Sequence, residues 1–138
     1  MLAHLDIKTA GAGRNAAEAS SAAILTASEM GRVLVFSYAT QTAGVPRDWA
    51  ATLEIPGVNL LPSLSAAAAE AVAEQVAAVR RPGDVVVISI HWGPNWGYVI
   101  TEEERSFAHA LIDRAGASII HGHSSHHPKP IEIYKNRL

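Results

Sequence analysis

Histidine is the residue type in this chain with the clearest chemical potential. Four of the seven histidines fall within seven residues, His121, His123, His126 and His127, and His91 ends an earlier apolar run. Imidazole nitrogen is a strong ligand for Mn, Fe or Zn, and the chain has no cysteine to offer a thiolate. We therefore predict a divalent metal site. His91, His123 and His126 are its candidate ligands and catalytic residues, and His121 and His127 are candidate supporting residues beside them.

Two predicted strands and one predicted helix would bring these histidines together. Asp84–Ile90 is a continuous apolar strand, a pattern typical of a strand covered on both faces, and Ser118–Ile120 is a second buried strand. Between them, Thr101 and Glu104 form a capping box that begins a helix. A right-handed crossover makes the strands parallel, so their C-terminal ends share one edge of a sheet. The alternative is that His91 only caps its strand and the loop histidines are solvated.

Other residues are candidates for substrate binding or for support of the ligands. Trp92 and Asn95 follow the first strand with Trp96, and they either form the wall of a cleft or cover the sheet edge. Arg14, at the start of a short helix, could hold an anion. Glu132 either orients a ligand histidine or faces solvent from an edge strand.

The remaining pattern predicts an α/β fold, with a mixed β-sheet and flanking helices. Ala22–Thr26 and Arg32–Ala39 predict a hairpin with its turn at Ser28–Gly31. The Ala-rich run Ser65–Arg80 predicts a helix. Its buried stripe would consist of Val72, Val76 and Val79. Further expected elements are a short helix capped by Asn15 and Glu18, an ordered loop over Gln41–Ser63 held by Trp49 and Leu53, a strand over Ile131–Tyr134, and a turn over Lys135–Arg137.

The composition fits one domain over residues 1–138. The net charge is −2, and 49% of the residues are hydrophobic, which leaves no basic footprint for nucleic acid or anionic lipid. The absence of cysteine excludes disulfides and thiol catalysis. No segment is long and apolar enough to cross a membrane, and the first residues show no signal-peptide pattern. We therefore expect a soluble protein that is cytoplasmic by default.

Three motifs closely resemble those of the CapA family, which is named for poly-gamma-glutamate capsule synthesis. They are Thr9–Asn15 (TAGAGRN), Ser89–Gly93 (SIHWG) and Gly122–His126 (GHSSH), the last followed by Pro130–Glu132. The resemblance covers essentially the whole chain. It implies a fold similar to that of calcineurin-like metallophosphoesterases, an αββα sandwich with two metal ions at the C-terminal edge of the sheet.

The resemblance also implies ligands and a reaction. His91 matches the family's lone histidine ligand, and His123 and His126 match the two histidines of the final motif, here spaced GHxxH. The family's aspartate strand, Gly-Asp motif and Asn-Asn-His motif are not in this sequence. The chain therefore resembles the C-terminal part of a truncated domain. Two divalent metals would there activate a water, for hydrolysis of a phosphoester or for action on a glutamate polymer.

Two other functions stay open on the sequence. A noncatalytic fragment or association module would bind one metal ion weakly at most. A single-metal hydrolase would need a carboxylate from Glu132 or Asp6. Sheet edges exposed by truncation further predict self-association of the chain.

Overall fold

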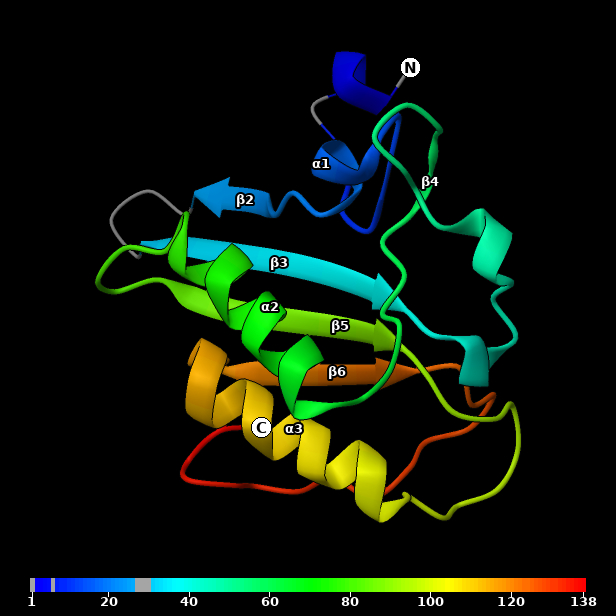
Figure 1. Cartoon of the computed structure of the whole chain (residues 1–138). Coiled ribbons are helices and arrows are strands. Elements are labelled where there is room, and N and C mark those ends of the chain that lie inside the picture. Colours follow the sequence, from blue (N-terminus) through cyan, green and yellow to red (C-terminus); the bar gives the residue numbers. More distant parts are fainter. Residues whose placement is uncertain (1, 6, 27–30) are drawn as a thin grey trace.

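A computed structural model describes residues 2–5, 7–26 and 31–138 and confirms the α/β fold with a mixed sheet (Figure 1). The main sheet has the strand order β2-β3-β5-β6. Its strands are β2 (Ala23–Thr26), β3 (Arg32–Ala39), β5 (Val85–His91) and β6 (Ile119–His123). The predicted hairpin pairing is confirmed, since β2 runs antiparallel to β3, whereas β3, β5 and β6 run parallel. Of the predicted hairpin turn, residues 28–30 lie outside the described residues.

Two helices cover one face of this sheet (Figure 1). They are α2 (Ala66–Ala77) and α3 (Glu102–Ala115), and they pack against each other. Alternate side chains of the central strands point toward them, because successive residues of a strand face opposite sides. The core that results includes Leu34, Phe36, Val86, Ile88 and Ile90, all at most 2% exposed.

The predicted valine stripe on α2 is only partly correct. Val72 and Val76 are each 1% exposed and belong to the core, but Val79 is 38% exposed. The helix ends at Ala77, before Val79, so the helical period no longer directs that side chain inward. No helix in the described part of the chain is long and apolar enough to cross a membrane.

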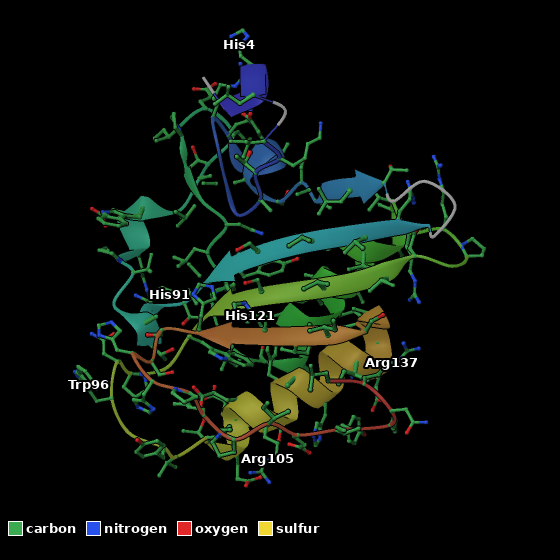
Figure 2. The ribbon with its side chains drawn as sticks, turned by 180° about the vertical axis from the view of Figure 1, so that it is seen from behind. His4, His91, Trp96, Arg105, His121 and Arg137 are labelled. Carbon is green, nitrogen blue, oxygen red and sulfur yellow. The ribbon has the colours of Figure 1, made fainter. Side chains whose placement is uncertain are left out.

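The opposite face of the sheet carries no helix within the described residues (Figure 2). Val85 on β5 is 40% exposed and Leu25 on β2 is 47% exposed. The prediction that β5 is covered on both faces is therefore wrong for this structure. The continuous apolar run supplies two apolar faces, but α2 and α3 both lie on the same side.

The predicted crossover from β5 to β6 is confirmed in its details. Thr101 Oγ1 accepts a hydrogen bond from the Glu104 amide at 3.1 Å, and Glu104 Oε2 accepts one from the Thr101 amide at 2.8 Å. The helix ends at Gly116, whose φ of 63° is left-handed and costs a glycine nothing. β6 then runs parallel to β5 and pairs His123 with His91.

The long loop is held differently from the prediction. Trp49 is 59% exposed and Leu53 is 87% exposed, so neither side chain fixes it to the body. Backbone hydrogen bonds do so instead, from Leu61 N to Ala39 O at 2.9 Å and from Ala39 N to Asn59 O at 3.0 Å. The smaller elements of the chain are η1 (Leu2–Leu5), β1 (Ala12–Gly13), α1 (Ala16–Ala19), η3 (Gln41–Ala43), η4 (Arg47–Trp49) and β4 (Gly57–Val58), with β1 antiparallel to β4.

The predicted strand over Ile131–Tyr134 does not form. Ile131 and Ile133 are 80% and 74% exposed, and Tyr134 instead stacks on His109 of α3 with ring centroids 3.7 Å apart. The following turn is present, with Lys135 and Asn136 at φ of 48° and 60°. Residues 131–134 therefore pack on a helix through side chains. After the turn, Leu138 does bond the sheet through its backbone: its carbonyl accepts from Ile120 N at 2.7 Å and its amide donates to Ser118 O at 3.3 Å.

Candidate metal centre

His91 and His123 form the centre of the histidine cluster. They occupy paired positions at the C-terminal ends of β5 and β6. Both lie on the open face of the sheet, which is the face opposite α2 and α3. Their Nδ1 atoms are 3.2 Å apart and their ring centroids 4.9 Å apart. The His91 carbonyl is fixed in turn by the amide and the hydroxyl of Thr40, both at 3.0 Å. The parallel crossover thus brings these two predicted ligands together.

His121 lies two residues earlier on the same face, in the same row as Ser89. The two residues are paired across β5 and β6, and Ser89 Oγ is 3.0 Å from His121 Nδ1. The His121 ring stacks on His123 at 5.4 Å. The SIHWG motif begins with Ser89, but no role at the site was predicted for this residue, although it stands two positions before His91. The alternation of a strand would have placed both side chains on one face.

The protonation of His123 is biased toward the neutral form. Partial burial lowers the pKa of this imidazole, and the nearby rings of His91 and His121 lower it further when they carry charge. A neutral imidazole keeps a lone pair on one ring nitrogen, which is the form that binds a metal ion.

The structure places His126 and His127 in an aromatic cluster rather than against His91. The His126 ring packs edge-on to Trp96 at 5.2 Å, and the His127 ring lies 4.3 Å from that of Tyr98. Two loops meet here, joined by the hydrogen bond from His126 N to Asn95 O at 3.0 Å. The predicted ligand His126 is thus positioned by the loop after β6 and not by the strand.

Only part of a metal-ligand set is assembled within the described residues. No group of three His, Asp or Glu side chains is close enough there to hold one ion. The arrangement does provide two imidazole nitrogens facing each other at one edge of the sheet.

The candidate substrate residues around this edge take different places. Trp92 turns to the helix side of the sheet and packs edge-on to Phe107 at 6.4 Å. Asn95 supports the loop, since its side-chain oxygen accepts a hydrogen bond from Ser124 Oγ at 3.5 Å and its carbonyl binds the His126 amide. Trp96 stays exposed, at 67%, as do Tyr98 and Val99 of the same loop, at 69% and 78%.

Arg14 and Glu132 are engaged elsewhere. Arg14, two residues before α1, forms an ion pair through its Nε with Glu18 of that helix at 2.9 Å. The main contacts of α1 are with β1 and β4. Glu132 pairs with His109 Nε2 at 2.8 Å and with Arg105 at 3.9 Å, both on α3. Glu132 thus orients His109 rather than a histidine of the cluster. Asp6, the other carboxylate considered, lies outside the described residues.

Known proteins match this chain along its whole length. The family described as Bacterial capsule synthesis protein PGA_cap matches residues 1–138. Proteins from two strains of Mycobacterium tuberculosis, each named a probable polyglutamine synthesis accessory protein, are 46% identical over 137 residues, which is 99% of this chain and 36% of theirs. The PGA biosynthesis protein CapA of Bacillus subtilis is 35% identical over 63 residues, 46% of this chain and 16% of its own.

The chain thus spans about a third of the length of the mycobacterial relatives. The match includes the end of β5, which carries His91, the end of β6, which carries His123, and the following loop, which carries His126. This confirms the resemblance stated from the motifs: the chain belongs to the Bacterial capsule synthesis protein PGA_cap family.

Proposed function

We propose that this chain contributes imidazole ligands to a divalent metal centre in a protein of capsule synthesis. The observation that carries the proposal is the 3.2 Å separation of the Nδ1 atoms of His91 and His123. Nitrogen ligands lie about 2.0–2.1 Å from zinc, and at tetrahedral or octahedral angles two of them are about 2.9–3.4 Å apart. The side chains as placed therefore fit two adjacent positions around one cation.

The donor set suits a metal that accepts nitrogen ligands, such as Mn, Fe or Zn. A bound cation of this kind would polarise an oxygen of the substrate and lower the pKa of a bound water. His126 is proposed as a further ligand, since it lies three residues after His123, in the loop that follows β6. The Ser89–His121 pair would support the site from beside His123.

The family and the names of the relatives support a role in making a polyglutamate capsule. The substrate we propose is a phosphoester or a glutamate polymer. Both offer the negatively charged oxygens that a divalent cation attracts. We propose that Trp96 and Asn95, in the loop that follows β5, contact this substrate.

Metal binding by the isolated chain tests the proposal. We expect calorimetric titration with Mn²⁺ or Zn²⁺ to show one tight ion, with affinity lowered at least about 10-fold by His91→Ala or His123→Ala. His4→Ala serves as the matched control, because His4 is exposed and belongs to η1. Equal metal affinity in the wild type and both cluster variants would contradict the proposal.

A second candidate function is association without catalysis, and the open face of the sheet favours it. Five apolar side chains lie on this face, beside the pairs Ser89–His121 and His91–His123. They are Val33, Val35, Val87, Val85 and Leu25. An apolar face of this kind is suited to contact a second copy of the chain. A chain that binds no metal but self-associates through this face would support the second candidate over the first.

A further inference from the structure

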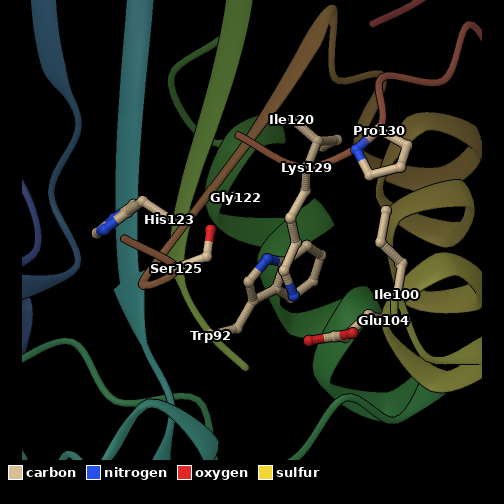
Figure 3. A pocket seen from close by; sticks show the side chains of 9 residues that line it. All are labelled: Trp92, Ile100, Glu104, Ile120, Gly122, His123, Ser125, Lys129 and Pro130. Carbon is tan, nitrogen blue, oxygen red and sulfur yellow. The ribbon is translucent and has the colours of Figure 1, made fainter. Parts of the chain in front are cut away.

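A cavity on the helix side of the sheet is not used by the candidate metal centre. It has a volume of about 170 Å³ and lies where β5 and β6 end, beside the first turn of α3 (Figure 3). Trp92, Glu104, Ser125 and Lys129 are among the residues that line it. His123 also borders it, but its ring points away from the cavity (Figure 3). The alternation of β5 explains the separation, because His91 and Trp92 face opposite sides of the sheet.

Glu104 presents an unpaired carboxylate oxygen to this cavity. The residue is only 7% exposed, and its Oε2 accepts hydrogen bonds from the amide and hydroxyl of Thr101 at 2.8 and 3.0 Å. Its Oε1 has no partner in the described part of the chain. Solvent reaches Oε1, so a ligand group at this oxygen would replace water rather than fill a sealed void. A Cβ at Gly93 would lie only 2.6 Å from Oε1, so the glycine leaves the approach to this atom open.

Two donors line the same cavity as this oxygen. Lys129 Nζ donates to Val99 O at 3.3 Å, and an ammonium group has two further hydrogens to give. It lies 4.0 Å from the Cβ position at Gly93, and no ion pair between Lys129 and Glu104 forms among the described residues. The indole nitrogen of Trp92 lies over Gly122, where a Cβ would collide with it, and finds no acceptor among the described residues.

The cavity therefore holds one negative acceptor and two donors, one of them positive, that do not satisfy each other. A simple cation would be repelled by Lys129, and a simple anion would be repelled by Glu104. A group carrying both charges a few bonds apart would pair with each. The volume is below the roughly 300–1,000 Å³ of sites for larger ligands, so the group must be small.

We propose that this cavity binds the zwitterionic head of an α-amino acid. Its ammonium group would donate to Glu104 Oε1, and its carboxylate would accept from Lys129 Nζ and the Trp92 indole. The same head has two possible sources, a free amino acid or the terminal residue of a γ-linked glutamate chain, which keeps its α-ammonium and α-carboxylate. The second source rests on the proposed function, whereas the first does not.

The Trp92 indole N–H signal in NMR spectra of the full chain provides the readout, assigned with Trp92→Phe. We expect this signal to shift saturably with glycine, L-glutamate or D-glutamate, but not with acetate or methylammonium at equal concentration. The dipeptide γ-glutamylglutamate tests the chain-end source: binding of the dipeptide alone assigns the cavity to a chain end, and binding of glycine as well assigns it to free amino acids. Either result supports the proposal.

Two charge variants test the contacts. Glu104→Gln keeps the capping box, because Gln also serves at that position, and removes the charge. We expect Glu104→Gln and Lys129→Met each to weaken binding about 10-fold or more. Glu103→Gln, exposed on the same helical turn, should leave binding unchanged.

His91→Ala should also leave this binding unchanged, which separates the inference from the metal proposal. Thermal unfolding confirms that each variant is folded. If neither the amino acids nor the dipeptide shifts the signal saturably, or if acetate shifts it equally, the inference is overturned.

Discussion

Gly122 is a residue whose lack of a side chain is required by its neighbour. It belongs to the GHSSH motif, and the Trp92 indole nitrogen occupies the space that a Cβ would fill. The motif glycine thus allows Trp92 to cross the end of β6 and reach Phe107. Here a feature that looks like part of a metal motif also has a packing reason.

We expect Gly122→Ala to destabilise the protein by about 1–3 kcal/mol, the usual cost of overpacking. The near-ultraviolet circular dichroism of the indole should change with it, because Trp92 has to move. Gly83→Ala is the comparison, because Gly83 has a φ of 87° and open space around it, so an alanine there causes backbone strain without overpacking. It should leave the near-ultraviolet signal of the indole unchanged. An unchanged spectrum and melting temperature in Gly122→Ala would contradict this packing.

Asp84 is a residue at which stability should depend on pH. Its carboxylate is 4% exposed and accepts two hydrogen bonds from Arg32, at 2.9 and 2.6 Å, and one from the Arg81 amide at 2.7 Å. The hydrogen bonds from Arg32 lower the pKa of Asp84 in the folded state, against the opposing effect of burial. The stabilisation is present above the unfolded-state pKa and is lost as the pH falls through the lower folded-state pKa.

We therefore expect the melting temperature of the wild type to fall between pH 5 and the acid range below the ordinary aspartate pKa of about 4. Asp84→Asn should melt lower at neutral pH and lose less on acidification, since it has no such proton to bind. Parallel melting curves against pH for the two proteins would show that this pair does not contribute.

The elements whose signals are local were predicted best. The capping box at Thr101 and the left-handed glycine at Gly116 act within a few residues, so the sequence alone reveals them. The end of α2 was predicted less well, because the helix ends at Ala77 and not at the predicted Arg80. The Ile131–Tyr134 segment failed because its partner is distant. Its alternating pattern is that of a strand, but the stacking of Tyr134 on His109 and the bonds from Tyr134 and Lys135 to Asp113 hold it on α3 instead.

The α3 cap offers a test at the scale of the element. Thr101→Ala removes the hydroxyl that accepts from the Glu104 amide, and should cost about 1 kcal/mol of unfolding free energy in urea titrations. Thr101→Ser keeps that hydroxyl and should cost much less. A loss of similar size in both variants would mean that the methyl group of Thr101, and not its cap, is what matters.

At the scale of the whole molecule, the main feature is the one-sided covering of the sheet. Helices α2 and α3 both pack on one face of the sheet. The open face carries valines toward the start of β3 and β5, and His91, His121 and His123 toward the C-terminal ends of β5 and β6 (Figure 2). Parallel sheets are normally covered on both faces. Within the described residues, no layer of helices covers this face.

We expect the isolated chain to self-associate through this face, as measured by light scattering over a range of concentrations. Val85→Lys and Leu25→Lys place charges on the open face and should shift the distribution toward monomer. Glu103→Lys makes a charge change on the exposed side of α3 and should have no such effect. A concentration-independent monomer in the wild type would refute the expectation.

The sequence by itself determined the fold class, the crossover and the strand end at which histidines gather. Apolar periodicity, caps and turns depend on residues that are neighbours in the sequence. The C-terminal ends of parallel strands must also lie at the same edge of the sheet. Only the tertiary structure decided which imidazoles meet. The register of β5 and β6 pairs His91 with His123 and Ser89 with His121, whereas His126 and His127 lie past the last strand residue and follow the contacts of their loop with Trp96 and Tyr98. Strand register and loop packing arise from contacts between distant segments, and no local pattern contains them.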